Sequence, residues 1–170
     1  MERLWAPWRI TYLSSGNKPQ GCILCQKVND GLDHDRENLV VYRGETGFIC
    51  LNLYPYTNGH LMVSPYEHTG SLEALDDASQ LELMHLVTLG TRLLRKVMNP
   101  AGYNIGINLG KAAGAGVDDH VHIHVVPRWE GDTNFMPIIG GTRVMPELLL
   151  ETRDKLAAMV PLVLGATDGA

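Results

Sequence analysis

Three histidines alternate with aliphatic residues in the segment His120-Val-His122-Ile-His124. Successive side chains of a β-strand point to opposite faces, so this spacing predicts a strand over 120–126 with all three imidazoles on one face and the aliphatic residues in the core. Such a row can ligate a metal ion, or one imidazole can act as a nucleophile while its neighbours orient it. A nucleophilic imidazole must be neutral, and a backbone carbonyl or a second imidazole can hold the proton on its other nitrogen. The alternative is a polar sheet face that happens to carry histidine.

A glycine-rich loop, Gly110-Lys-Ala-Ala-Gly114-Ala-Gly116, precedes this strand and ends at Asp118 and Asp119. Backbone N–H groups that no side chain shields can hold phosphate oxygens. The loop is not a Walker motif, because no Gly-Lys-Ser/Thr opens a helix after it. A flexible turn would explain the loop equally well on its own, but its position beside the histidines favours phosphate binding.

Cys22 and Cys25 are separated by two residues, which is the spacing of half a zinc site. Two further ligands are needed, and from spacing alone His68 and one histidine of the alternating row could supply them. An odd number of cysteines does not indicate a disulfide framework, so a metal site or a redox pair is the hypothesis. The third cysteine, Cys50, lies in an expected strand and is interpreted as a small buried hydrophobic residue.

The elements that must position these residues can be located from periodicity. Apolar residues at helical spacing predict a long helix over 77–98, which begins with capping-box spacing between Asp77 and Gln80 and ends at Asn99-Pro100. A last helix is expected from about residue 146 to 160. Further short apolar runs, bounded by turn residues, predict strands over 39–42, 47–53, 60–64 and 103–109. The pattern indicates an α+β domain built on an antiparallel sheet.

The length of 170 residues fits a single domain over 1–170, with 1–20 expected as an N-terminal arm and 161–170 as a flexible tail. Hydrophobic residues make up 45% and charged residues 19%, which excludes a disordered chain. A net charge of −5 argues against nucleic acid and anionic membranes as partners, since both require a basic surface. No apolar run is long enough to cross a membrane and no secretory signal is recognised, so a cytoplasmic location is expected.

The motifs together resemble the histidine-triad (HIT) superfamily of nucleotide hydrolases and transferases. The matching residues are the alternating histidines at 120–126 and the upstream segment Asn58-Gly59-His60-Leu-Met-Val-Ser-Pro65, and the resemblance covers about residues 20–130. Two flanking segments, Leu4-Trp-Ala-Pro-Trp-Arg9 and Val126-Pro-Arg-Trp-x-Gly-Asp-x-Asn-Phe135, are similar to the bacterial diadenosine tetraphosphate phosphorylase branch. They extend the match to about residues 4–135.

The resemblance implies a HIT-like antiparallel sheet with one long helix and a C-terminal helix, in a protein that is usually a homodimer. It implies a nucleotidyltransferase that cleaves diadenosine tetraphosphate with inorganic phosphate to ATP and ADP. His122 would attack the α-phosphorus and form an adenylyl-histidine, while His124 and His60 would position the nucleophile and the phosphate.

The resemblance also assigns nucleotide-binding positions, which match Asn52 by its spacing to His60, and Asn108, Gly114 and Gly116 in the phosphate-contacting region. Relatives carry polar residues where this chain has Ala115 and Gly116, so a side-chain contact to phosphate is expected to be missing from that turn.

Zinc-bearing members of the superfamily bind the ion with residues that match Cys22, Cys25, His68 and His120. Four protein ligands close the tetrahedron and leave no position for water, so the resemblance implies structural zinc.

Three other hypotheses remain at this point. The protein could be a hydrolase of dinucleoside polyphosphates or nucleoside phosphoramidates, with water in place of phosphate. The alternating histidines could instead form the catalytic metal site of a zinc hydrolase. The third hypothesis is a nucleotide-binding module without catalysis.

Overall fold

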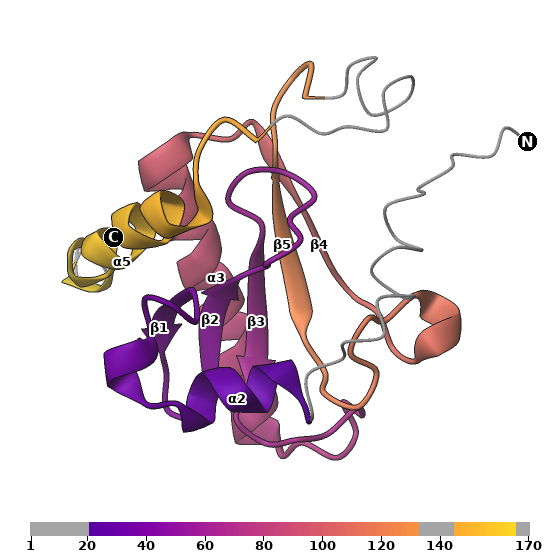
Figure 1. Ribbon diagram of the computed structural model, residues 1–170. Helices are drawn as coiled ribbons and strands as arrows, with labels where there is room; N and C mark the ends of the chain where they lie inside the picture. Colours follow the sequence, from indigo (N-terminus) through magenta and orange to yellow (C-terminus); the bar gives the residue numbers. More distant parts are fainter. Residues whose placement is uncertain (1–20, 133–144, 166–170) are drawn as a thin grey trace, which may run out of the picture.

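The computed structural model describes residues 21–132 and 145–165, and their centre is a five-stranded antiparallel sheet (Figure 1). The strands lie in the order β1-β2-β3-β5-β4, so β5 is inserted between β3 and β4. Their bounds are Val40–Arg43 for β1, Gly47–Leu51 for β2, Leu61–Pro65 for β3, Gly102–Ile107 for β4 and Ile123–Arg128 for β5.

Helices cover the two faces of the sheet unequally. The long helix α3 (Asp77–Met98) and the C-terminal helix α5 (Leu149–Gly165) pack on one face and form the larger apolar core with it. The short helix α2 (Ile23–Asn29) crosses the opposite face (Figure 1), where its buried Leu24 packs in a smaller cluster with residues of β1, β2 and β3. Two one-turn 3-10 helices complete the described elements, η1 (Leu32–His34) and η2 (Lys111–Ala113). The α+β fold expected from the sequence is confirmed.

Helix α3 has the bounds that its periodicity predicts, but the residue that caps it differs from the expectation. The N-cap is Asp76, whose carboxylate accepts a hydrogen bond of 2.8 Å from the backbone N–H of Ser79, so the predicted capping pair of Asp77 and Gln80 is wrong by one position. An aspartate at either position could accept the bond, and the backbone conformation selects Asp76. Asn99 ends the helix in the left-handed region at φ 46°, as a C-terminal asparagine commonly does.

Helix α5 continues five residues past its predicted end at residue 160. Pro161 lies inside the helix, where it removes one backbone hydrogen bond and would ordinarily end the element. The following turn is retained because Val163 is buried in the larger core and its carbonyl accepts a hydrogen bond of 2.9 Å from Arg92 of α3. Residues 161–165 of the expected flexible tail are therefore helical, and the rest of that tail and the expected N-terminal arm lie outside the described residues.

The sheet matches the predicted strands to within about two residues at most ends, with one difference that bears on function. Strand β5 begins at Ile123, so His120 and His122 precede the strand that was predicted to contain them. The alternation of faces nevertheless holds, because Val121, Ile123 and Val125 all belong to the larger core. Cys50 is fully buried as expected, and burial raises the pKa of its thiol to about 11. Within the described residues no helix combines the length and the apolar character that a membrane span requires.

Candidate active site and metal centre

The alternating histidines lie on the face of the sheet that carries α2. In the antiparallel pairing of β3 with β5, His124 is opposite Met62, which belongs to the smaller cluster under α2. Since the aliphatic residues between the histidines fill the other core, the imidazoles are directed away from α3 and α5. The aliphatic face of this segment, packed in the larger core, thus determines where the histidines point.

His122 is buried, with 6% of its surface exposed, and its ring is held by the backbone two residues earlier. Its Nδ1 lies 2.9 Å from the carbonyl oxygen of His120. A carbonyl only accepts, so Nδ1 carries the proton and Nε2 of the neutral ring carries the lone pair. Burial lowers the pKa of His122, which favours this neutral form.

A chain of hydrogen bonds runs from a backbone amide through two imidazoles. The N–H of Tyr56 donates to Nδ1 of His60 at 3.1 Å, which places the His60 proton on Nε2. That nitrogen lies 3.0 Å from Nδ1 of His124, so it donates to His124, whose own proton is then on Nε2. Burial, with a smaller effect from His122, lowers the pKa of His124 to about 4, so this ring also stays neutral near pH 7. The side-chain amide of Asn108 lies 3.5 Å from Nε2 of His124.

Asn52 lies beside this chain, at the other end of the loop that leads to His60. Its backbone N–H donates to the His60 carbonyl at 2.9 Å, and its side-chain nitrogen lies 3.4 Å from Nδ1 of His60. The structure thus brings together four of the predicted site residues, His60, His124, Asn52 and Asn108. Ribose binding by Asn52 remains a prediction.

The glycine-rich loop contains η2, and its backbone N–H groups are partly used within the loop. Those of Ala113 and Ala115 donate to the carbonyl of Gly110, and that of Gly114 donates to Lys111. Gly114 lies in the left-handed region at φ 89°, which a residue with a side chain would rarely adopt. Phosphate binding by Gly114 and Gly116 remains a prediction, and in this conformation the amides of 113–115 are directed to carbonyls of the loop itself.

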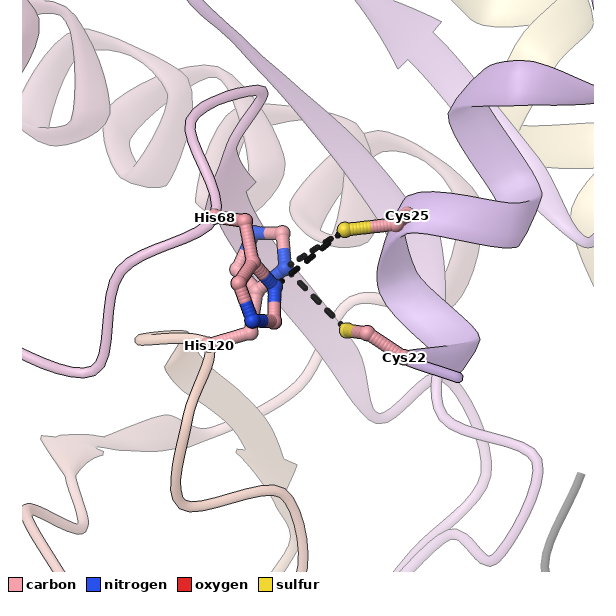
Figure 2. Close-up of side chains that lie close together, drawn as sticks. All are labelled: Cys22, Cys25, His68 and His120. Carbon is pink, nitrogen blue, oxygen red and sulfur yellow. Dashed lines mark hydrogen bonds between the residues drawn. The ribbon is translucent and has the colours of Figure 1, made fainter. Parts of the chain in front are cut away.

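The predicted metal ligands meet at the N-terminus of α2 (Figure 2). The two sulfur atoms and one nitrogen of each histidine all lie within 4.8 Å of one another. Nδ1 of His120 is 3.2 Å from Sγ of Cys22 and 3.5 Å from Sγ of Cys25, and Nδ1 of His68 is 3.3 Å from the same Cys25 sulfur. A tetrahedral zinc site with ordinary Zn–S and Zn–N bonds requires sulfur and nitrogen about 3.5 Å apart. The four side chains therefore fit zinc.

Contacts outside the ligand set orient both imidazoles for metal binding. Nε2 of His120 donates to the carbonyl of Pro65 at 2.9 Å, which leaves the lone pair on Nδ1 toward the sulfur atoms. Nε2 of His68 lies 3.7 Å from the carboxylate of Asp119, an arrangement typical of metal-bound histidine. Burial lowers the pKa of His120 and favours the neutral ring that a ligand needs.

The group of four candidate metal ligands separates the roles of the alternating histidines. It is the one group in the described part of the chain that could hold a metal ion, and it contains His120 but neither His122 nor His124. The hypothesis that the three histidines form one catalytic metal site is therefore not supported by the geometry. His120 turns to the cysteines, while His122 and His124 pack edge to face with their ring centres 4.9 Å apart.

Sequence reasoning missed the partners that fix these rings and the backbone that carries them. Tyr56 contributes its amide to His60, Pro65 its carbonyl to His120, and Ser64 its hydroxyl to the carbonyl of Val121. Two of the three contacts are made by backbone atoms, which leave no signal in residue type. Ser64 is the one that composition could have indicated, because it is a lone polar side chain in an apolar run.

Comparisons with known proteins show the family of this chain. The sequence profile of the HIT domain family matches residues 34–131, more than half of the chain. The chain belongs to the HIT domain family. The AP-4-A phosphorylase of Mycobacterium tuberculosis is 43% identical to this HIT protein over 167 residues, which are 92% of this chain and 83% of the relative. The resemblance seen in the sequence motifs is confirmed.

Two further proteins are similar to this chain, one by its sequence and one by its solved structure. The adenosine 5'-monophosphoramidase of Schizosaccharomyces pombe is 35% identical over 109 residues, 63% of this chain and 74% of the relative. Among solved structures, a zinc-bound histidine triad family protein from Mycobacterium smegmatis superposes with a TM-score of 0.69 at 29% identity, over 86% of this chain and 97% of that chain.

Proposed function

We propose that this HIT protein is a nucleotidyltransferase that cleaves diadenosine tetraphosphate with inorganic phosphate to ATP and ADP through an adenylyl-histidine on His122. The observation that carries the proposal is the 2.9 Å hydrogen bond from Nδ1 of His122 to the His120 carbonyl. It makes Nε2 the nucleophilic atom of a neutral, buried imidazole. The likeness to a phosphorylase of this substrate over most of the chain supports the choice of substrate.

The reaction consists of two displacements at the α-phosphorus. In the first, the lone pair of His122 Nε2 forms the P–N bond while the P–O bond to the leaving chain breaks, and ATP departs. In the second, an oxygen of inorganic phosphate attacks the same phosphorus, the P–N bond breaks, and the adenylyl group leaves as ADP. The covalent intermediate thus divides the transfer of the adenylyl group from the dinucleotide to phosphate into two steps.

His124, Asn108 and the imidazole chain behind them are proposed to bind the α-phosphate. The chain from Tyr56 through His60 makes Nε2 of His124 an N–H donor. The side-chain amide of Asn108 carries a second N–H donor, and its nitrogen lies 3.5 Å from Nε2 of His124, so an anionic oxygen bound beside both would accept from each. Neutral imidazoles in a partly buried site supply these hydrogen bonds without repelling one another as cations would.

Zinc held by Cys22, Cys25, His68 and His120 is proposed to be structural. When bound, the ion supplies a fixed junction between α2, the loop carrying His68 and the histidine segment, and with four protein ligands it offers no position to substrate. A cytoplasmic location fits the same proposal, because the two cysteines must stay reduced to bind a metal, and thiols are kept reduced there.

The protein is further proposed to be a homodimer. Strand β4 is at the edge of the sheet and pairs only with β5 among the described strands, and its Ile105 is 49% exposed. An edge strand with an exposed apolar residue can pair with the same strand of a second copy. Light scattering at several concentrations tests this, and a mass of one chain throughout would contradict it.

The activity is tested by chromatography of the products from diadenosine tetraphosphate, with and without inorganic phosphate. ATP and ADP that appear only with phosphate support the proposal, and intact-mass analysis without phosphate should show an adenylyl group on the protein. His122→Ala should give neither products nor adduct while it retains its zinc. Turnover by that variant would refute the assignment of the nucleophile.

The second candidate is a hydrolase of dinucleoside polyphosphates or nucleoside phosphoramidates, which the likeness to an adenosine 5'-monophosphoramidase favours. In that case water replaces phosphate in the second displacement. AMP formed at the same rate with and without phosphate would establish the hydrolase and exclude the phosphorylase.

A further inference from the structure

The backbone pairing that holds β5 against β3 ends before the nucleophile. The paired residues are Leu61 with Val125, Met62 with His124, and Val63 with Ile123. Ser64 and Pro65 follow in β3, and the proline nitrogen has no hydrogen to donate. The segment 120–122, which carries His122, therefore needs contacts of another kind.

Besides the contacts of His120 with the two cysteines, three hydrogen bonds among the described residues hold this segment in place of regular pairing. The hydroxyl of Ser64 donates to the carbonyl of Val121 at 3.0 Å, and the backbone N–H of Val121 donates to the carbonyl of Thr69 at 2.6 Å. Nε2 of His120 donates to the carbonyl of Pro65 at 2.9 Å. Only the bond from Ser64 joins a side chain of β3 to the backbone next to His122.

The carbonyl of Val121 belongs to the peptide group that includes the backbone nitrogen of His122. Rotation of that peptide would turn the Cα of His122 and change the direction of its ring. The ring itself is attached to the preceding carbonyl, that of His120. Two consecutive carbonyls thus orient His122. The His120 carbonyl holds the imidazole, and the Val121 carbonyl, through its bond from Ser64, holds the backbone that carries the ring.

The residue type at position 64 supports this role. Ser64 is fully buried and is the one polar side chain of β3, whose other members are Leu61, Met62, Val63 and Pro65. An aliphatic residue would fill a buried strand position without a hydrogen-bonding requirement, whereas a buried hydroxyl is tolerated when it is bonded. The bond it makes is to the histidine segment.

We propose that Ser64 is a positioning residue for His122, and that its hydroxyl sets the direction of the attacking Nε2. The inference rests on the proposed function, because it assigns His122 as the nucleophile. Ser64→Ala removes the donor and leaves the Val121 peptide without it. Attack on phosphorus is sensitive to small displacements, so the rate constant of adenylyl transfer at saturating substrate should fall about tenfold or more. KM should stay within about twofold, because Ser64 does not touch the substrate.

The test uses the zinc-loaded protein and a matched control. Tyr66→Phe removes a hydroxyl–carbonyl bond of the same length, 3.0 Å, at the same end of β3, but that bond goes to Gly44 in the turn between β1 and β2. Single-turnover formation of the adenylyl-protein from diadenosine tetraphosphate, without phosphate, is measured for wild type and both variants. Tyr66→Phe should react at the wild-type rate, and Ser64→Ala should be slow.

A second readout does not depend on activity. Long-range ¹H–¹⁵N spectra show which ring nitrogen of His122 carries the proton, and the wild type should have it on Nδ1 alone. Ser64→Ala should give a mixture of the two tautomers. If Ser64→Ala does not fold, Ser64→Cys keeps a weak donor of similar size and should show an intermediate loss in both measurements.

The outcomes separate the two proposals. A wild type that forms no adenylyl-protein refutes the proposed function, and the tautomer spectra then decide on Ser64 alone. A reactive wild type with an equally fast Ser64→Ala variant overturns the role of Ser64. An unchanged His122 tautomer in Ser64→Ala would also overturn it, as would a loss of rate in Tyr66→Phe as large as that in Ser64→Ala.

Discussion

The pKa of His124 predicts a specific loss of stability in acid. The folded protein holds this pKa near 4 against an ordinary value of 6.5, because most of the ring is withdrawn from solvent and it lies beside His122. Protonation is therefore easier in the unfolded chain, so the stabilisation by His124 is complete above pH 6.5 and is lost as the pH falls toward 4. Between pH 7.5 and pH 5 the full effect on the free energy of unfolding would be about 2 kcal/mol. The side chain is partly exposed, which reduces the expected loss to about 1 kcal/mol.

The measurement is a comparison of three zinc-loaded proteins by urea denaturation at pH 7.5 and pH 5. His124→Gln removes the titrating group, so its free energy of unfolding should fall by about 1 kcal/mol less than that of the wild type over this interval. Effects shared by all three proteins, including acid release of zinc, cancel in the subtraction. His85→Gln is the matched control for a histidine-to-glutamine change, because it lies at an exposed position on α3. Equal losses in the wild type and His124→Gln would refute the argument from burial.

Three further predictions concern the metal centre, the loop before His60 and the C-terminal helix. Cys25→Ser should lower the zinc content measured by mass spectrometry well below one ion per chain and increase amide exchange first in α2, and full zinc occupancy would contradict the assigned ligand. Gly59→Ala should lower the free energy of unfolding by about 1–2 kcal/mol and slow turnover, because Gly59 has a φ of +77° and an added Cβ would lie 2.6 Å from the sulfur of Met98. Arg92→Ala should lower the free energy of unfolding by about 1 kcal/mol in urea denaturation and increase amide hydrogen exchange after Pro161, because Arg92 donates to the Val163 carbonyl beyond the proline. Unchanged amide protection after Pro161 would exclude this role.

The parts of the fold that the sequence predicted are those with a long apolar period. Helix α3 runs over 22 residues with buried positions on one face, so both its ends could be located to the residue. Helix α2 could not be predicted, because it has seven residues and buries only Leu24, which leaves no apolar period to recognise. The end of α5 was missed because burial of Val163 and the hydrogen bond from Arg92 outweigh the effect of Pro161, and neither is visible locally.

The candidate site shows the same division between local pattern and tertiary contact. Alternation alone predicted the shared face of the histidines, which the core position of the intervening valines and isoleucine confirms. It could not predict that His120 would turn to the cysteines while His124 joined His60, because those partners are distant in sequence. The resemblance supplied both assignments, and hydrogen bonds to backbone carbonyls and amides give them their physical cause.

The alternation in the histidine segment makes its length as consequential as its composition. His120 is a proposed zinc ligand, His122 is the proposed nucleophile, and Val121 and Ile123 between the histidines fill a core on the opposite face. Deleting or inserting a single residue between His120 and His124 would exchange the two faces for everything beyond that point. Imidazoles would then be forced into the apolar core and aliphatic side chains into the site. An insertion or deletion of one residue would therefore abolish the proposed metal site and the catalytic arrangement together. Substitutions in this segment can be graded in their effects, whereas a shift of register is all or none.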